Sequence, residues 1–369
     1  MTPIVVVRTV ATATCWTIQY GYNTIMIEDN NSVLSKLKLA IFLVLWYSTA
    51  TGNGLFSRAS SKYLMNAVVE SSSKAILILQ GSIALSFVQL LLTGVCGLGA
   101  SYIQESINSH RTGQKSTRIG IVRSLTTMYT SRKSRQSTFL IGLLNFLGVV
   151  ATNLSFFLGS VSLTHLIKSS EPLFTSMYSY IISPESSLSS KKFAGMTLIT
   201  IGVATASYSN KASAYYGCAA ALISSLLFPL RNVLIKKMVS KEDATINGIQ
   251  LFFVISFISS VIGVFVLLGM NISPIVRLPW IEHIVAVSST PVRTMIYFDT
   301  VMSAVTFLCY NTFSMIVLQQ CSVSTHAIFN ILKRGVVILI SAVLIDHNLN
   351  QHLAMGTGLA MVGLWLYKS

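Results

Sequence analysis

Long, continuous apolar runs alternate with short polar segments along the chain. Each run has roughly 17 to 25 residues, enough for a helix to cross the ~30 Å hydrocarbon core of a bilayer. The runs do not alternate between apolar and polar positions, so a membrane barrel is disfavoured. The pattern predicts an all-α, multi-pass membrane protein with ten transmembrane helices, at about 37–56, 75–99, 138–159, 161–183, 193–209, 213–235, 247–269, 297–319, 322–345 and 351–367.

The composition supports this interpretation. Hydrophobic residues make up 52% of the 369 residues and charged residues only 10%, with a mean hydropathy of +0.67, which is outside the range of an ordinary soluble domain. Most of the 26 Lys and Arg residues fall on the side of the predicted topology that holds both termini. The positive-inside bias therefore predicts that both termini face the cytosol or its equivalent.

The net charge of +15 could suggest a nucleic-acid partner. The densest basic segment, 111–135, lies between two predicted helices and is interpreted as a solvated positive-inside loop. The expected environment is therefore a lipid bilayer, and no nucleic acid is expected to bind.

Four basic residues lie inside predicted spans, and the nearby acidic residue is Glu171. A charge near the middle of a bilayer costs several kcal/mol, so such residues usually face a cavity and mark a substrate path. One of the four, near the end of its run, could instead extend to the membrane surface. The sequence thus predicts a cationic cavity formed by Lys168, Arg231, Lys333 and Arg334.

A weak internal repeat relates the two halves of the chain. An offset of 161 residues aligns His165 with His326, Gly195 with Gly356 and Gly202 with Gly363. Lys168 and Lys333 follow their histidines by three and seven residues, which places both on the same helix face. Since five helices per half reverse the orientation, the halves 37–209 and 213–369 are predicted to be inverted repeats around a site at mid-membrane. The segment 1–36 precedes them and has no predicted structure.

The sequence offers no catalytic or metal-binding motif. Its five cysteines form no C-x-x-C pair, and its histidines form no H-E-x-x-H arrangement. It also lacks a P-loop and a G-x-S-x-G motif. No enzyme activity, cofactor or metal site is therefore expected.

Four stretches resemble the plastid phosphate translocators, the triose-phosphate translocator family of the drug/metabolite transporter superfamily. They are SVSLTHLIKSSEPLF, FPLRNVLIKKM, YNTFSMIVLQQCSVSTHAIFNILKR and the closing glycine-containing helix, and the similarity runs from about residue 37 to the C-terminus. The resemblance implies ten helices, an inverted repeat, and exchange of inorganic phosphate for phosphorylated C3, C5 or C6 compounds. By position it implies that Lys168, Lys333 and Arg334 bind the phosphate, and that Arg231, Thr152 and Tyr310 line the rest of the pocket.

One position departs from the triose-phosphate pattern. Members selective for triose phosphate typically carry a His nineteen residues before the first motif lysine, and here that position is Val149. The repeat offset pairs Val149 with Tyr310, which also marks it as a pocket position. A valine cannot donate a hydrogen bond to a substrate, and members selective for phosphoenolpyruvate also lack the His. The preferred substrate among triose phosphate, 3-phosphoglycerate and phosphoenolpyruvate therefore stays open.

Location and class have alternatives at this stage. The first 27 residues contain no acidic residue, which suits organelle targeting, but Arg8 is their only basic residue. The resemblance implies a chloroplast or apicoplast membrane, with a Golgi or endomembrane location as the alternative. The alternative functions are a nucleotide-sugar or other drug/metabolite-type transporter, and a polytopic enzyme or scaffold.

Overall fold

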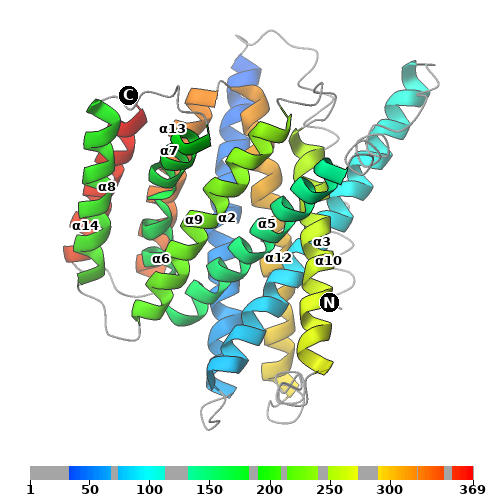
Figure 1. Cartoon of the computed structure of the whole chain (residues 1–369), viewed down its shortest axis with the longest axis horizontal. Helices are drawn as coiled ribbons and strands as arrows, with labels where there is room; N and C mark the ends of the chain where they lie inside the picture. The colour runs from blue at the N-terminus through cyan, green and yellow to red at the C-terminus, as the bar shows by residue number, and fades with distance from the viewer. Residues whose placement is uncertain are drawn as a thin grey trace.

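The computed structural model describes residues 33–67, 74–112, 132–182, 190–208, 214–239, 248–272, 290–321, 323–344 and 351–368. Every regular element in these ranges is an α-helix (Figure 1). The helices are α2 (Val33–Ala67), α3 (Lys74–Thr112), α5 (Arg132–Leu158), α6 (Val161–Lys168), α7 (Glu171–Ile182), α8 (Ser190–Tyr208), α9 (Ala214–Val239), α10 (Gly248–Ile272), α12 (Thr290–Gln320), α13 (Val323–Leu344) and α14 (Gln351–Lys368).

The predicted all-α membrane fold is confirmed. Each predicted span coincides with one helix, except the fourth, which coincides with α6 and α7 together. By length and composition, 6 of the described helices could cross a membrane, namely α2, α3, α5, α9, α10 and α12. Most of the N-terminal segment, 1–32, and most of the basic segment, 113–131, lie outside the described residues.

The fourth predicted span is broken in its middle. Pro172 has no backbone N–H to donate to the carbonyl of Lys168, and its ring would clash with that carbonyl in a continuous helix. The chain instead forms a tight turn, in which the N–H groups of Ser169 and Ser170 donate to Leu166 and Ile167 at 2.9 and 3.0 Å. As a result Lys168 ends α6 and Glu171 begins α7.

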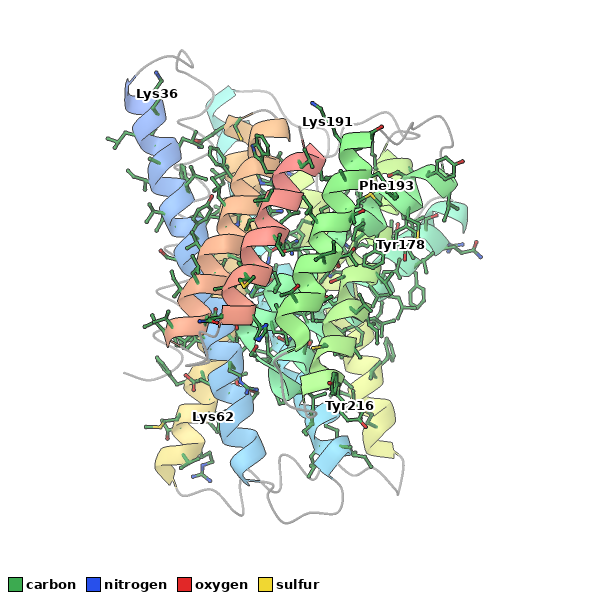
Figure 2. All side chains as sticks on the ribbon, turned by 90° about the vertical axis from the view of Figure 1, so that its left-hand side faces the viewer. Lys36, Lys62, Tyr178, Lys191, Phe193 and Tyr216 are labelled. Carbon is green, nitrogen blue, oxygen red and sulfur yellow. The ribbon has the colours of Figure 1, made fainter. Side chains whose placement is uncertain are left out.

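The bundle carries apolar side chains outside and many polar ones inside. Phe265 is 70% exposed and Trp365 is 63% exposed, and Figure 2 shows Tyr178, Phe193 and Tyr216 on one outer face. Buried polar side chains include Gln89 and Asn145. This distribution suits a lipid surround, where the polar groups must be satisfied between helices.

The helices pack in pairs that join the two predicted halves. The most extensive contacts are those of α8 with α14, α2 with α12, α5 with α9, and α3 with α10 (Figure 1). In the predicted repeat, the counterparts of α2, α3, α5 and α8 are α9, α10, α12 and α14, in that order. Exchanging each helix for its counterpart leaves the first and last pairs unchanged and converts the second pair into the third. Lys36 and Lys191 lie at one end of the bundle and Lys62 at the other (Figure 2), as the predicted topology requires. The inverted orientation of the halves stays a prediction.

Glycines allow α8 and α14 to approach closely. A Cβ atom on Gly202 would lie 2.7 Å from the backbone nitrogen of Ala360, and one on Gly195 would lie 2.6 Å from the carbonyl oxygen of Gly363. Real Cβ atoms do not make such contacts with backbone. These are two of the glycine positions that the sequence offset had aligned, and small residues of this kind let membrane helices pack backbone to backbone.

A valine at Gly356 is expected to destabilise the protein by about 1–3 kcal/mol through overpacking. A Cβ atom there would lie 2.7 Å from the Cβ of Ala206. Gly358, on the same helix, has nothing within 4 Å of its Cβ position, so Gly358→Val is the matched control. Thermal unfolding in detergent should show a lower midpoint for Gly356→Val alone, and equal midpoints would contradict the close approach of α8 and α14.

Candidate functional site

A cavity of about 100 Å³ lies inside the bundle. A water molecule needs about 10–15 Å³ by this measure, so the cavity holds several waters or a small ion. Six of the seven residues singled out from the sequence line it, namely Lys168, Lys333, Arg334, Tyr310, Thr152 and Val149.

Lys168 reaches the cavity from the end of α6. Its ammonium group donates hydrogen bonds to the hydroxyl oxygens of Thr152 on α5, at 3.1 Å, and Ser224 on α9, at 2.9 Å. The same group lies 4.4 Å from the centre of the Phe228 ring, which is within cation–π range. The break after Lys168 thus sets a cation where α5, α6 and α9 meet.

Glu171 joins cations from the two halves. Its carboxylate lies 3.4 Å from the Lys168 ammonium and forms an ion pair with the guanidinium of Arg334 on α13. Glu171 itself is not among the cavity-lining side chains. One negative charge behind the cavity wall therefore holds two positive charges that face the cavity.

Lys333 is the cation with the least compensation. Within the described ranges no carboxylate lies within ion-pair distance of its ammonium group. It lies instead 4.7 Å from the centre of the Trp46 ring and 5.8 Å from that of Tyr310. Cation–π contacts offset only part of the cost of burying a charge, so the charge of Lys333 is only partly compensated within the described residues.

Arg231 lies beside the cavity and not on its wall. Its guanidinium is 4.8 Å from the centre of the Phe228 ring, the same ring that the Lys168 ammonium contacts. It donates to the amide oxygen of Asn145 on α5 and to that of Asn232. Hydrogen bonds to two amides thus hold Arg231 inside the bundle, next to the cavity that the sequence had predicted it to line.

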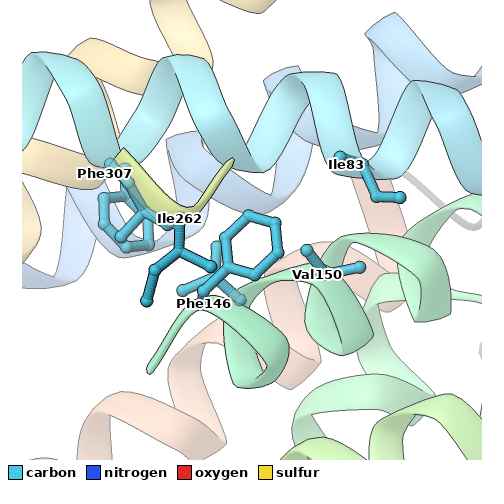
Figure 3. Close-up of a cluster of buried hydrophobic side chains, with 7 residues drawn as sticks. Ile83, Phe146, Val150, Ile262 and Phe307 are labelled. Atoms are coloured by element: carbon cyan, nitrogen blue, oxygen red, sulfur yellow. The ribbon is translucent and has the colours of Figure 1, made fainter. Parts of the chain in front are cut away.

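Val149 has two environments. It is 2% exposed and belongs to an apolar cluster with Phe146, Val150 and Phe307, among others, part of which appears in Figure 3. It also lines the cavity. Position 149 is therefore a place where an apolar side chain faces whatever the cavity contains.

Three amides form a polar wall that the sequence did not reveal. Gln89, Asn53 and Asn153 line the cavity and are hydrogen-bonded to one another. Asn153 donates to the amide oxygen of Gln89 at 2.8 Å, and Gln89 donates to Ser303 at 2.7 Å and to Asn53 at 3.3 Å. Neutral polar residues are common in buried helices and carry no charge signal, so nothing in the chain separated these three from the other amides.

His165 is a further residue to which sequence reasoning assigned no role. It lines the cavity one turn before Lys168, and its Nε2 atom is buried with no hydrogen-bond partner within the described part of the chain. Leaving such an atom unpaired costs about 1–3 kcal/mol. The signal available was its spacing of three residues from Lys168, which places both on one helix face.

Helices long and apolar enough to cross a bilayer surround a cationic cavity, an arrangement typical of membrane transporters. The chain belongs to the Triose-phosphate Transporter family, whose sequence model matches residues 37–368. This confirms the resemblance seen in the sequence motifs.

Named relatives give the match more detail. Phosphoenolpyruvate/phosphate translocator 1, chloroplastic, of Arabidopsis thaliana is 31% identical over 231 residues, which is 62% of this chain and 54% of that protein. The triose phosphate/phosphate translocator, non-green plastid, chloroplastic, of Brassica oleracea var. botrytis is 30% identical over 233 residues, 62% of this chain and 55% of that protein. The chain thus spans about half the length of the curated relatives that it matches.

Proposed function

We propose that this protein is an antiporter that exchanges inorganic phosphate for a phosphorylated small metabolite of the triose phosphate, 3-phosphoglycerate or phosphoenolpyruvate class. In this proposal Lys168, Lys333 and Arg334 bind the phosphate group, and Thr152, Tyr310 and Val149 line the rest of the pocket. Arg231 adds positive charge from behind Phe228. The observation that carries the proposal is the convergence of cations from both halves of the chain on one cavity in the bundle.

Electrostatics favour a phosphate over a neutral solute. Three cationic side chains face the cavity and one carboxylate, Glu171, lies behind two of them. A phosphate group carries about −1.5 to −2 charges at neutral pH. It can accept charge-assisted hydrogen bonds from Lys and paired ones from Arg. It also balances the excess positive charge, whose burial without an anion costs free energy.

The cavity size favours small phosphates over nucleotide sugars. Sites for drug-sized ligands have volumes of about 300–1,000 Å³, several times the volume of this cavity. We infer further that the protein performs no covalent chemistry, as the transporter family suggests. The plastid relatives, which are named chloroplastic, support a plastid-type membrane as the location.

Counter-exchange in liposomes tests the proposal. Purified protein is reconstituted into liposomes loaded with phosphate, and uptake of labelled phosphate is measured with external competitors. Phosphoenolpyruvate, 3-phosphoglycerate or dihydroxyacetone phosphate should compete, and nucleoside monophosphates should not. Competition by nucleotides alone would assign the protein to the nucleotide-sugar transporters instead.

Replacing Val149 by His is expected to change the ranking of competitors. The imidazole adds a donor at a position that faces the cavity, which should favour triose phosphate and 3-phosphoglycerate over phosphoenolpyruvate by about 2- to 10-fold, the worth of one hydrogen bond. Val149→Leu enlarges the side chain without adding a donor and is the control. The inhibition constants of the three compounds against phosphate uptake provide the measurement. If Val149→His ranks the three compounds as wild type and Val149→Leu do, residue 149 does not contact the substrate.

A further inference from the structure

The two histidines aligned by the repeat have different environments. The Nε2 atom of His326 lies 3.1 Å from the carbonyl oxygen and 3.3 Å from the hydroxyl of Ser314. Its ring stacks on Trp46 with a centroid distance of 5.0 Å, and it is not among the cavity-lining residues. Packing and hydrogen bonding within the protein therefore account for His326.

They do not account for His165. Its ring lies 5.9 Å from that of Phe156, tilted by 35°, and Nε2 faces α2 at Gly54, where even a Cβ atom would be 3.9 Å away. Within the described residues Nε2 has no hydrogen-bond partner, yet the ring borders the cavity. A buried polar atom left unpaired next to a binding cavity is explained by a ligand that supplies the missing partner.

Several neutral side chains of the cavity wall have no donor available for a ligand. Val149 has none, and the amides of Gln89 and Asn153 already donate to other side chains. Thr152 donates its hydroxyl to the carbonyl of Gly148 or shares it with Ser224. The phosphorylated metabolites of the proposed class all carry a second polar group, a carboxylate, hydroxyl or carbonyl, at the end away from the phosphate. Inorganic phosphate has no such end.

We propose that His165 donates a hydrogen bond to the non-phosphate oxygen of the counter-substrate and so discriminates phosphorylated metabolites from inorganic phosphate. A neutral imidazole carries one N–H that can serve as this donor, and the His165 ring already borders the cavity. The role rests on the proposed function, because it needs the phosphate end of the same molecule to lie at Lys168, Lys333 and Arg334.

The test compares His165→Phe with wild type in phosphate-loaded liposomes. Phenylalanine keeps an aromatic ring against Phe156 and removes the donor. Two constants are measured, the KM for labelled phosphate and the inhibition constant of the strongest competitor among phosphoenolpyruvate, 3-phosphoglycerate and dihydroxyacetone phosphate. The ratio of the second constant to the first is expected to rise about tenfold.

Three further variants separate recognition from structure. His165→Gln retains an N–H donor and should keep the ratio closer to wild type than Phe does. His165→Leu also lacks a donor and serves in place of His165→Phe if that protein fails to assemble. His326→Phe, the matched change in the other half, should leave the ratio unchanged even if it lowers the thermal midpoint.

An unchanged ratio in folded His165→Phe, or an equal rise in both constants, would overturn the role of His165 while phosphate exchange by the wild type still stands. A wild-type protein that exchanges no phosphate would instead overturn the proposed function, and the role of His165 with it.

Discussion

Replacing Lys333 by alanine is expected to slow phosphate exchange by at least about 30-fold while the protein stays folded and inserted. Removing one partner of a desolvated, hydrogen-bonded charge pair costs about 2–5 kcal/mol of binding, which corresponds to about 30-fold or more in affinity. In the proposed site Lys333 would contact the phosphate directly, and its other contacts are the rings of Trp46 and Tyr310.

The same substitution should leave stability equal or raised. Lys333 has no ion-pair partner within the part of the chain that the structure describes, so its removal relieves the desolvation of a buried cation without stranding a carboxylate. Arg334→Ala and Lys168→Ala should also slow exchange strongly, but each removes a partner of Glu171 and should lower the thermal midpoint as well. The Lys333→Ala substitution therefore tests substrate binding without an expected loss of stability.

Uptake of labelled phosphate and thermal unfolding, measured on the same preparations, check this pair of expectations. Lys236→Ala removes the same charge from an exposed position near the end of α9 and should keep wild-type uptake. Wild-type uptake by correctly inserted Lys333→Ala would remove Lys333 from the site.

The helices were predictable because the bilayer imposes a length and a polarity on each of them. Their ends were less so. The second predicted span stops near residue 99 while α3 continues to Thr112, because hydropathy marks only the part of a helix that lipid surrounds. The break between α6 and α7 falls in an apolar run, and only Pro172 and the two serines before it indicated a turn there.

The candidate site was predictable where it is charged. Lys168, Lys333 and Arg334 are conspicuous because charges are rare in apolar runs, and all three line the cavity. Gln89 and His165 are neutral, and their position depends on how α3 and α6 rotate against their neighbours, which one sequence does not encode locally. For Arg231 the charge was visible in the sequence but its partner was not, because Asn145 lies 86 residues away in the chain.

Labelled phosphate is expected to enter liposomes that contain phosphate or a phosphorylated counter-substrate at least about tenfold faster than empty ones. Three positive charges line the cavity, those of Lys168, Lys333 and Arg334, and the carboxylate of Glu171 compensates one of them. If one half of the protein rocks against the other, the occluded cavity loses its access to water. Without an anion, that step would desolvate the uncompensated cations at a cost of several kcal/mol.

A bound phosphate removes most of this cost, because a charge of about −2 balances the excess at the cavity. The bound anion thus stabilises the occluded state relative to the open states. The loaded carrier should therefore alternate quickly and the empty carrier slowly. The return step then needs an anion on the other side of the membrane, which makes exchange obligatory. The control is a set of liposomes loaded with chloride at equal ionic strength, which should behave as empty ones. Comparable initial rates with and without internal phosphate would mean that the empty carrier reorients freely, and that the excess charge at Lys333 does not govern alternation.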